Sequence, residues 1–320
     1  MSWTPGRTLR VGAAALCLSV AGANAQQSAP IERQGPSSDV GTIRVESRLV
    51  PVVVNVVDAD GAPVAGLTQD DFDVLEDGKP QRIAVFDKQS TTPLSMAIAV
   101  DASESTAGLS HLERDALRDF LRKLMRPQDK AALFSFADRV DEVVPFTNDA
   151  HRLESGFGRI VRGDATALYD AIYLGAQELS TTSDPKARRI LVLITDGENT
   201  THHGSYDAAL EQAQRAGAMI YSLIVIPVVA DAGRNTGGEH ALIQMSRDTG
   251  GHFYEVIDKH DLAPAFDHLS DDLRTQYTVG YYAPSHPLSR VALRHIELRL
   301  KDPALRAKYT LRYRTSYYGR

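Results

Sequence analysis

The chain has 320 residues, of which 43% are hydrophobic, and its formal net charge at pH 7 is −6. This length allows one large domain or two modest ones, with a sizeable hydrophobic core. A negatively charged chain is a poor candidate for nonspecific binding to nucleic acid, because the phosphates repel it. We therefore expect a globular protein that does not bind nucleic acid.

Residues 1–25 have the pattern of a secretory signal peptide. Arg7 and Arg10 form a short basic region, an apolar run follows at 11–20, and Ala23-Asn24-Ala25 is a small-residue cleavage site. The apolar run is too short to span a membrane as a helix, and we expect no transmembrane segment in the mature chain. The only cysteine, Cys17, lies in this segment, so the mature chain would lack disulfides and thiolate metal ligands. The sequence predicts export, either to a periplasm or out of the cell.

Two β-rich segments lie on either side of a longer central region. Residues 26–40 are rich in Gln, Ser and Pro and predict a flexible linker. The segment 41–90 shows period-two alternation and contains Asp77-Gly78, a signal for a two-residue hairpin turn. The segment 275–320 returns to the same alternation. Because each segment has too few strands for a sandwich of its own, we hypothesise that the two join into one β-sandwich.

The central region, residues 91–274, alternates between strand and helix periods. Apolar runs predict strands, of which the ranges are 94–101, 130–137, 141–146, 188–195, 218–226 and 251–256. Helical periods fall at 109–124, 166–179, 205–216 and 260–273. This order predicts an α/β domain with a doubly wound, mostly parallel six-stranded sheet flanked by helices. A dinucleotide-binding domain is disfavoured because no Gly-x-Gly-x-x-Gly follows any of these strands.

Oxygen-bearing side chains follow two of the buried strands. Asp101, Ser103 and Ser105 alternate after the strand at 94–101, and Asp196 follows the strand at 188–195. Adjacent parallel strands end about 4.8 Å apart, so the two aspartates could face one ion. Hard oxygen ligands indicate Mg2+, or else Mn2+ or Ca2+. The alternative for each residue is a turn or helix cap.

The order of these residues resembles the von Willebrand factor type A domain with its metal-ion-dependent adhesion site. That family has an aspartate and two serines after the first strand, a threonine in a later loop, and an aspartate after the fourth strand. The resemblance covers residues 91–265, and the five ligands that it implies are Asp101, Ser103, Ser105, Thr166 and Asp196. It also implies that the cation accepts an acidic residue from a partner protein. The Glu-Asp-Gly-Lys hairpin and the tyrosine-rich tail are similar to those of bacterial VWFA-related domain proteins.

These residues favour a binding protein over an enzyme. No general base or activated nucleophile accompanies the candidate ligands, and motifs such as Gly-x-Ser-x-Gly and His-Glu-x-x-His are missing. We interpret His202 and His203 as exposed loop residues, and the loop 227–238 as an insertion or a partner-contact loop. Two alternatives stay open: a metal-assisted hydrolase, and a structural module whose metal site is vestigial.

Overall fold

The computed structural model describes residues 48–88, 91–104, 110–181, 184, 187–226, 236–283 and 292–319. The predicted signal peptide and linker lie outside the described residues, and so does the candidate ligand Ser105. No helix in the described part of the chain has the length and apolar character needed to cross a membrane.

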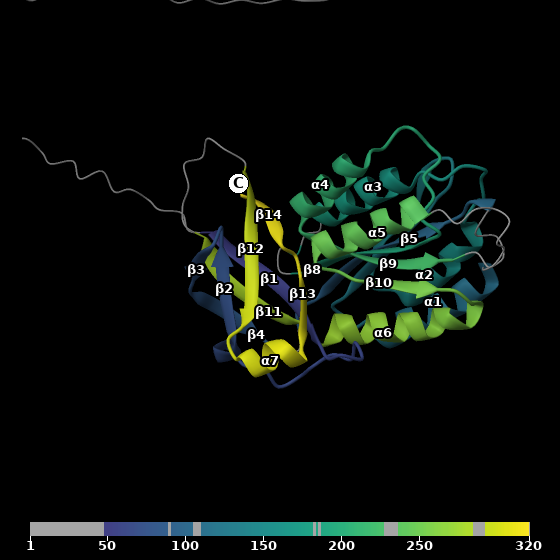
Figure 1. Cartoon of the computed structure of the whole chain (residues 1–320). Helices are drawn as coiled ribbons and strands as arrows, with labels where there is room; N and C mark the ends of the chain where they lie inside the picture. The colour runs from purple at the N-terminus through teal and green to yellow at the C-terminus, as the bar shows by residue number, and fades with distance from the viewer. Residues whose placement is uncertain are drawn as a thin grey trace, which may run out of the picture. The chain divides into compact units, whose positions relative to one another are not determined.

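The α/β part is built on one six-stranded sheet (Figure 1). In spatial order its strands are β10 (Phe253–Val256), β9 (Ala218–Val225), β8 (Arg188–Thr195), β5 (Leu94–Asp101), β6 (Lys130–Phe136) and β7 (Val140–Thr147). All neighbours pair in parallel except β7, which runs antiparallel at the edge. The predicted doubly wound, mostly parallel sheet is confirmed.

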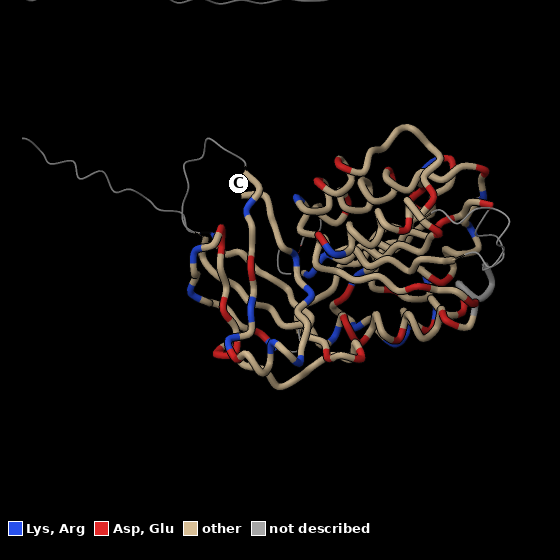
Figure 2. The backbone as a smooth tube through the Cα atoms, in the orientation of Figure 1, with Lys and Arg blue, Asp and Glu red and all other residues tan. Residues whose placement is uncertain are grey.

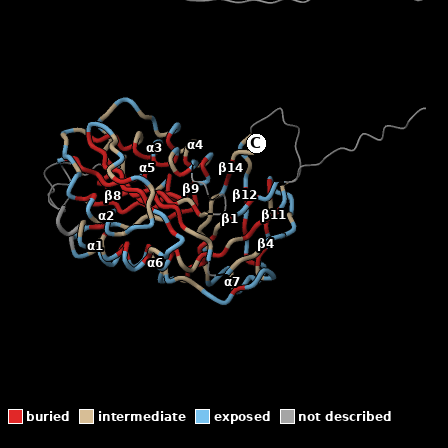
Figure 3. Tube along the Cα trace, turned by 180° about the vertical axis from the view of Figure 1, so that it is seen from behind, coloured by how far each residue is buried: buried red, intermediate tan, exposed pale blue. Residues whose placement is uncertain are grey.

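Helices cover both faces of this sheet (Figure 1). On one face lie α1 (Ser110–Leu124), α2 (Ala150–Gly156) and α6 (Leu262–Arg274), and on the other α3 (Leu168–Ser180), α4 (Tyr206–Ala216) and α5 (Thr236–Thr249). Along β5, Met96 and Ile98 pack toward the first group, while Ala97 and Ala99 pack toward the second. All eight residues of β5 are buried, and Figure 3 shows buried residues concentrated along the central strands. A strand covered on both faces explains the continuous apolar run in the sequence.

The remaining strands form two antiparallel four-stranded sheets, and each sheet mixes strands from both ends of the chain (Figure 1). One sheet has the order β13 (Thr310–Tyr313), β1 (Arg48–Val57), β11 (Tyr277–Ala283) and β4 (Ile83–Asp87). The other has the order β14 (Ser316–Gly319), β12 (Ala292–Leu300), β2 (Phe72–Glu76) and β3 (Lys79–Gln81). A short helix, α7 (Pro303–Lys308), and the 3-10 turns Gln69–Asp71, Phe157–Arg159 and Lys259–Asp261 complete the described elements.

The two antiparallel sheets share one apolar core. Alternate residues of β1, such as Val52 and Val54, pack with Tyr277 and Val279 of the same sheet and with Phe72 and Leu298 of the opposite one. The β-sandwich predicted from the two terminal segments is confirmed. The hairpin signal is confirmed as well, because Asp77 and Gly78 both have positive φ, at 48° and 77°, as a type I′ turn requires.

A polar network joins the sandwich to the α/β part. The Tyr221 hydroxyl accepts hydrogen bonds from Asn55 Nδ2 at 3.2 Å and from Gln276 Nε2 at 2.8 Å. Gln276 in turn accepts from Arg188, which also donates to the Leu273 carbonyl at 2.9 Å. Tyr221 and Gln276 are almost fully buried. Buried polar groups need such partners, so these bonds fix how β1 meets the amino end of the central sheet.

The half-buried His252, next to β10, should make stability depend on pH. Burial lowers the pKa of its imidazole from 6.5 to about 3, and the charges of Arg312 and Arg247 act in the same direction. Between these values the unfolded chain takes up a proton that the folded chain does not, so the His252 contribution is present above pH 6.5 and lost toward pH 3. We expect the Tm of His252→Gln to decrease less than the Tm of the wild type as the pH is lowered from 7 to 4 in thermal melts. The exposed His151→Gln is the matched control, and equal slopes in wild type and His252→Gln would contradict this account.

Candidate metal centre

Asp101 ends β5 and ties that strand to its neighbour β8. Its Oδ1 accepts a hydrogen bond from the Ser103 backbone N–H at 2.9 Å, and its Oδ2 accepts from Thr195 Oγ1 at 2.6 Å. The carboxylate is buried, and burial raises its pKa, with a further contribution in the same direction from the nearby charge of Asp196. The carboxylates at the ends of β5 and β8 are therefore close enough for the charge of Asp196 to raise the pKa of Asp101.

Ser103 lies where a second loop touches the first. It forms an isolated parallel bridge with Gly163, whose N–H donates to the Ala102 carbonyl at 3.2 Å. A Cβ on Gly163 would stand 1.9 Å from Asp138 Oδ2 and 2.9 Å from Ala137 Cβ. Only glycine lets the chain approach Ala137 and Asp138, after β6, so closely. The bridge and the hydrogen bond to Ala102 hold the loop that leads to α3 against the Asp101–Ser103 loop.

Thr166 connects this second loop to a third. Its backbone N–H donates to Thr200 Oγ1 at 2.8 Å, and its carbonyl accepts from the N–H groups of Thr200 at 3.0 Å and Thr201 at 3.3 Å. The threonine is buried and precedes α3, whose N-cap is Ala167, so Thr166 does not cap the helix. The helix begins two residues later than the sequence predicted, and the Thr166 hydroxyl is not used as a cap.

Asp196 follows β8 directly and starts the third loop. Its Oδ1 accepts from the Glu198 N–H at 3.0 Å, and Gly197 turns the chain with a φ of 85°. A Cβ on Gly197 would stand 2.9 Å from the Gly238 carbonyl carbon and 3.1 Å from the Glu239 nitrogen. The first turn of α5 therefore lies against the Asp196 loop.

Of the five predicted ligands, four lie in three loops that are hydrogen-bonded to one another at the carboxyl end of the central sheet. These four are Asp101, Ser103, Thr166 and Asp196, and all are buried. Ser105, the fifth, lies outside the described residues. His202 and His203 are exposed in the same loop as Asp196, as the sequence predicted.

Two residues that the sequence analysis missed belong to the same region. Thr195 is fully buried, and besides donating to Asp101 its hydroxyl accepts from the Gly197 N–H at 3.1 Å. Glu239 is 6% exposed and lies in the first turn of α5, beside Gly197. The only sequence signals were a hydroxyl at the last position of a strand and an acid in the first turn of a helix.

The donor set fits a small hard cation. Its side chains offer carboxylate and hydroxyl oxygens, the ligand types that Mg2+, Mn2+ and Ca2+ prefer. Among the residues that the structure describes, no cluster of three or more His, Cys, Asp and Glu side chains could hold a metal. The candidate site therefore differs from a carboxylate or histidine cage, because it has two aspartates and hydroxyls supply the other oxygens.

The central sheet, with helices on both faces and three loops joined at its carboxyl end, is a doubly wound α/β domain. Residues 96–198 match the family model of the von Willebrand factor type A domain. This part of the chain is therefore similar to von Willebrand factor type A domains, and domains of that family commonly mediate protein interactions. No curated protein matches the chain in sequence.

Solved structures share this fold at low sequence identity. Proximal thread matrix protein 1 from the mussel byssus, with a zinc-occupied MIDAS motif, has a TM-score of 0.50 and 16% identity over 62% of this chain and 50% of its own. BatB from Bacteroides thetaiotaomicron has a TM-score of 0.45 and 20% identity over 57% of this chain and 100% of its own. The von Willebrand domain of the type V pili tip protein Mfa5 from Porphyromonas gingivalis has a TM-score of 0.46 and 13% identity over 57% and 96%.

Proposed function

We propose that this chain is an exported protein-binding module that holds a divalent cation and uses it to grip an acidic residue of a partner protein. The cation is Mg2+, or Mn2+ or Ca2+, and its ligands are Asp101, Ser103, Ser105, Thr166 and Asp196. The observation that carries the proposal is the pair of hydrogen bonds from Thr195 to Asp101 and from Thr166 to Thr200, which ties three oxygen-bearing loops together.

The charge of the ligand set favours a partner carboxylate as the missing ligand. Two aspartates neutralise a divalent cation without adding excess negative charge, and Mg2+ retains water readily at an open position. An incoming carboxylate can replace that water. The burial that raises the pKa of Asp101 also supports the proposal, because a bound cation would offset the cost of a buried carboxylate.

Two further features support the proposal. The mussel protein with a zinc-occupied MIDAS motif shares the fold, and its metal is consistent with a divalent cation in the corresponding region here. Export rests on the sequence alone, on the basic, apolar and small-residue pattern of residues 1–25.

Cation binding should stabilise the folded chain measurably. At a free Mg2+ or Mn2+ concentration of about 100 times its Kd, the stabilisation would be about 2.7 kcal/mol. For a chain of this size that corresponds to a Tm increase of about 5–10 °C. In differential scanning calorimetry, Asp101→Ala should fold but lose this increase, while Asp60→Ala, in the exposed turn after β1, should keep it. If neither ion changes the Tm of the wild type, the metal site is vestigial and the domain is a structural module.

Partner binding should depend on the same ion. We expect that crosslinking in intact cells supplied with Mg2+, followed by pull-down, captures a partner protein. The partner should not be captured when EDTA is present during crosslinking, or when Asp101→Ala replaces the wild type. Capture that persists in EDTA would contradict the proposed grip. Metal-dependent turnover of a panel of phosphate and peptide substrates would instead favour the hydrolase alternative.

A further inference from the structure

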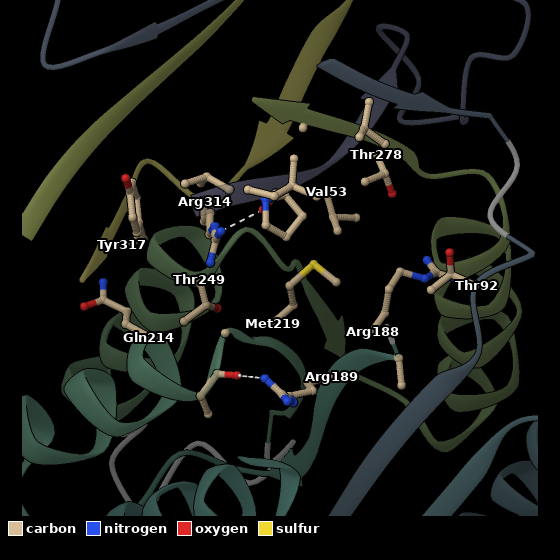
Figure 4. A pocket seen from close by; sticks show the side chains of 18 of the residues that line it. Val53, Thr92, Arg188, Arg189, Gln214, Met219, Thr249, Thr278, Arg314 and Tyr317 are labelled. Carbon is tan, nitrogen blue, oxygen red and sulfur yellow. Dashed lines mark hydrogen bonds between the residues drawn. The ribbon is translucent and has the colours of Figure 1, made fainter. Parts of the chain in front are cut away.

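A cavity lies at the amino ends of the central strands, whereas the candidate metal centre lies at their carboxyl ends. Its volume is about 610 Å3, and its walls come from the sandwich strands β1, β11 and β4 and from the amino ends of β8 and β9 (Figure 4). Arg188 begins β8 and Asp196 follows it, so eight residues separate the two sites. At about 3.3 Å per residue, that is about 26 Å.

The sandwich wall of the cavity is apolar. Leu49 and Val85 are 39% and 37% exposed, and Gly280 lies between them. A Cβ on Gly280 would stand 3.1 Å from Val85 Cβ and 3.2 Å from Leu49 Cδ1, so the glycine keeps this wall open. Met219 lines the facing wall, and Figure 4 shows it between Arg189 and the sandwich. These surfaces suit the apolar body of a ligand.

The cavity is also rich in positive charge. Its walls contain one acid, Asp87, and five arginines, which are Arg48, Arg188, Arg189, Arg215 and Arg314. Figure 2 shows Lys and Arg positions where the last strands face the α/β part, and Figure 4 shows Arg314 and Arg189 reaching from opposite walls. Arg215 forms an ion pair with Glu211 of its own helix, at 2.5 Å.

Three of the cavity arginines donate hydrogen bonds to neutral groups of the chain. Arg189 donates to the Ala216 carbonyl at 2.8 Å, and Arg314 donates to the Pro51 carbonyl at 2.7 Å (Figure 4). Arg188 donates to the Leu273 carbonyl and to the Gln276 amide. Neither Arg188 nor Arg314 forms an ion pair with any residue that the structure describes. The positive charges of Arg188 and Arg314 are therefore not balanced by a carboxylate of the described part of the chain.

Some of these guanidinium groups also have unused donors. Arg188 is 5% exposed, yet its Nε and Nη2 have no hydrogen-bond partner among the described residues, and the same holds for Arg314 Nε. Burial lowers the pKa of Arg188 to about 10, which still leaves it charged at neutral pH. A buried charged donor without an acceptor is costly, and such donors in natural proteins call for an explanation.

We propose that this cavity binds a small amphiphilic anion, with a carboxylate or phosphate head held by arginines and an apolar body on Leu49, Val85 and Met219. An oxyanion accepts from a guanidinium fork through two parallel hydrogen bonds, which a neutral ligand cannot match. Because its walls come from both the sandwich and the α/β part, a ligand here would also stabilise their junction. This site is independent of the metal-dependent grip proposed above.

Isothermal titration calorimetry on the full chain in EDTA tests this proposal, with decanoate, decyl phosphate and decanol as probes. We expect at least one of the two anions to bind at least about tenfold more tightly than the uncharged decanol. The preference between the two anions identifies the head group. Binding should survive in Asp101→Ala, which separates this site from the metal centre. Equal binding of decanol and both anions, or no binding of either anion, would overturn the proposal.

Variants of the cavity locate the binding. Met219→Trp fills the space between the walls, and Arg314→Met removes one donor while keeping apolar bulk. Each should weaken anion binding at least about tenfold, whereas Arg299→Gln, which removes an exposed arginine on β12, should leave it unchanged. Thermal melts show whether each variant folds. If Met219→Trp does not fold, Arg314→Met alone tests the site. Wild-type affinity in the folded cavity variants would place the anion elsewhere and refute the site.

Discussion

A chain shortened to end at Arg274 is expected to lose the whole β-sandwich and not only its last strands. In the full chain β1 lies between β11 and β13, and it pairs with β11 from Arg48↔Ala283 to Val54↔Tyr277. β2 likewise lies between β12 and β3. Removal of residues 275–320 leaves β1 without either neighbour and leaves β2 with only the short β3. An isolated hairpin of this kind is marginal in water.

The apolar core makes the expected loss large. Seven of its buried residues come from the removed segment, namely Tyr277, Val279, Tyr281, Ile296, Leu298, Leu300 and Tyr317. Burial of one such side chain contributes about 1.5–3 kcal/mol, and a whole domain is stable by only about 5–15 kcal/mol. The valines of β1 would then face water. The sandwich strands before residue 88 should unfold as a unit.

Hydrogen exchange with mass spectrometry measures this effect directly. Peptides from 48–57 and 72–76 should exchange rapidly in the shortened chain, whereas a chain without residues 1–40 should keep them protected. Loss of protection would support the domain boundaries that we propose, with 41–90 and 275–320 forming one unit around 91–274. Protected amides at 48–57 in the shortened chain would mean that the first segment folds alone, and these boundaries would be wrong.

The sequence was sufficient wherever local pattern decides structure. The apolar run that begins at Leu94 and ends before Asp101 predicted a strand buried on both faces, and the period-two alternation around Val52, Val54 and Val56 predicted a β-strand. The sequence could not predict the strand order of the sandwich. The pairing of β1 with β11 joins residues more than 200 positions apart, and such pairing depends on packing rather than on local preference.

Three helices were not predicted, and each has a local reason. The short α2 and α7 have seven and six residues, too few to show a clear helical period. The longer α5 begins with Thr236-Gly237-Gly238, and each glycine costs a helix about 1 kcal/mol relative to alanine. Its stability comes from burial of Leu242 and Met245 against the sheet. The sequence analysis therefore assigned its first turn to a loop.

The candidate site shows the same division. Asp101, Ser103 and Asp196 were proposed as ligands because a strand end followed by oxygen side chains is visible in the sequence, and Thr166 was proposed from the family resemblance. Thr195 was missed because its hydrogen bond spans 94 positions of the chain to Asp101. Contacts of that kind form only when the two strands lie side by side in the fold, and no periodicity in the local sequence predicts them.

Asp129 is another such residue, and its replacement should be among the most damaging in the α/β domain. It is fully buried in the turn before β6. Its Oδ1 accepts from the Leu94 N–H at 2.8 Å, and its Oδ2 accepts from the Arg126 N–H at 2.8 Å. The same Oδ2 lies 2.5 Å from Arg274 Nη2 at the end of α6. One carboxylate therefore connects the start of β5, the turn before β6 and the last turn of α6.

Asp129→Ala would remove all three hydrogen bonds at once. The side chain of Arg274 is only 16% exposed, so its charge would stay largely buried without a counterion, and the Leu94 N–H would lose its acceptor. Breaking a buried pair from one side costs about 3–5 kcal/mol. We expect a Tm decrease of about 6–15 °C and a lower midpoint in urea at an unchanged m-value.

Two comparison variants separate the charge of Asp129 from its hydrogen bonds. Asp129→Asn keeps an acceptor for Leu94 but loses the ion pair with Arg274. Its Tm should therefore lie between those of the wild type and Asp129→Ala. Asp267→Ala removes an exposed pair with Lys123 and should cost less than about 1 kcal/mol, because water screens that pair. If Asp129→Ala were no worse than Asp267→Ala, the buried carboxylate would not be what holds α6 to the amino end of the sheet.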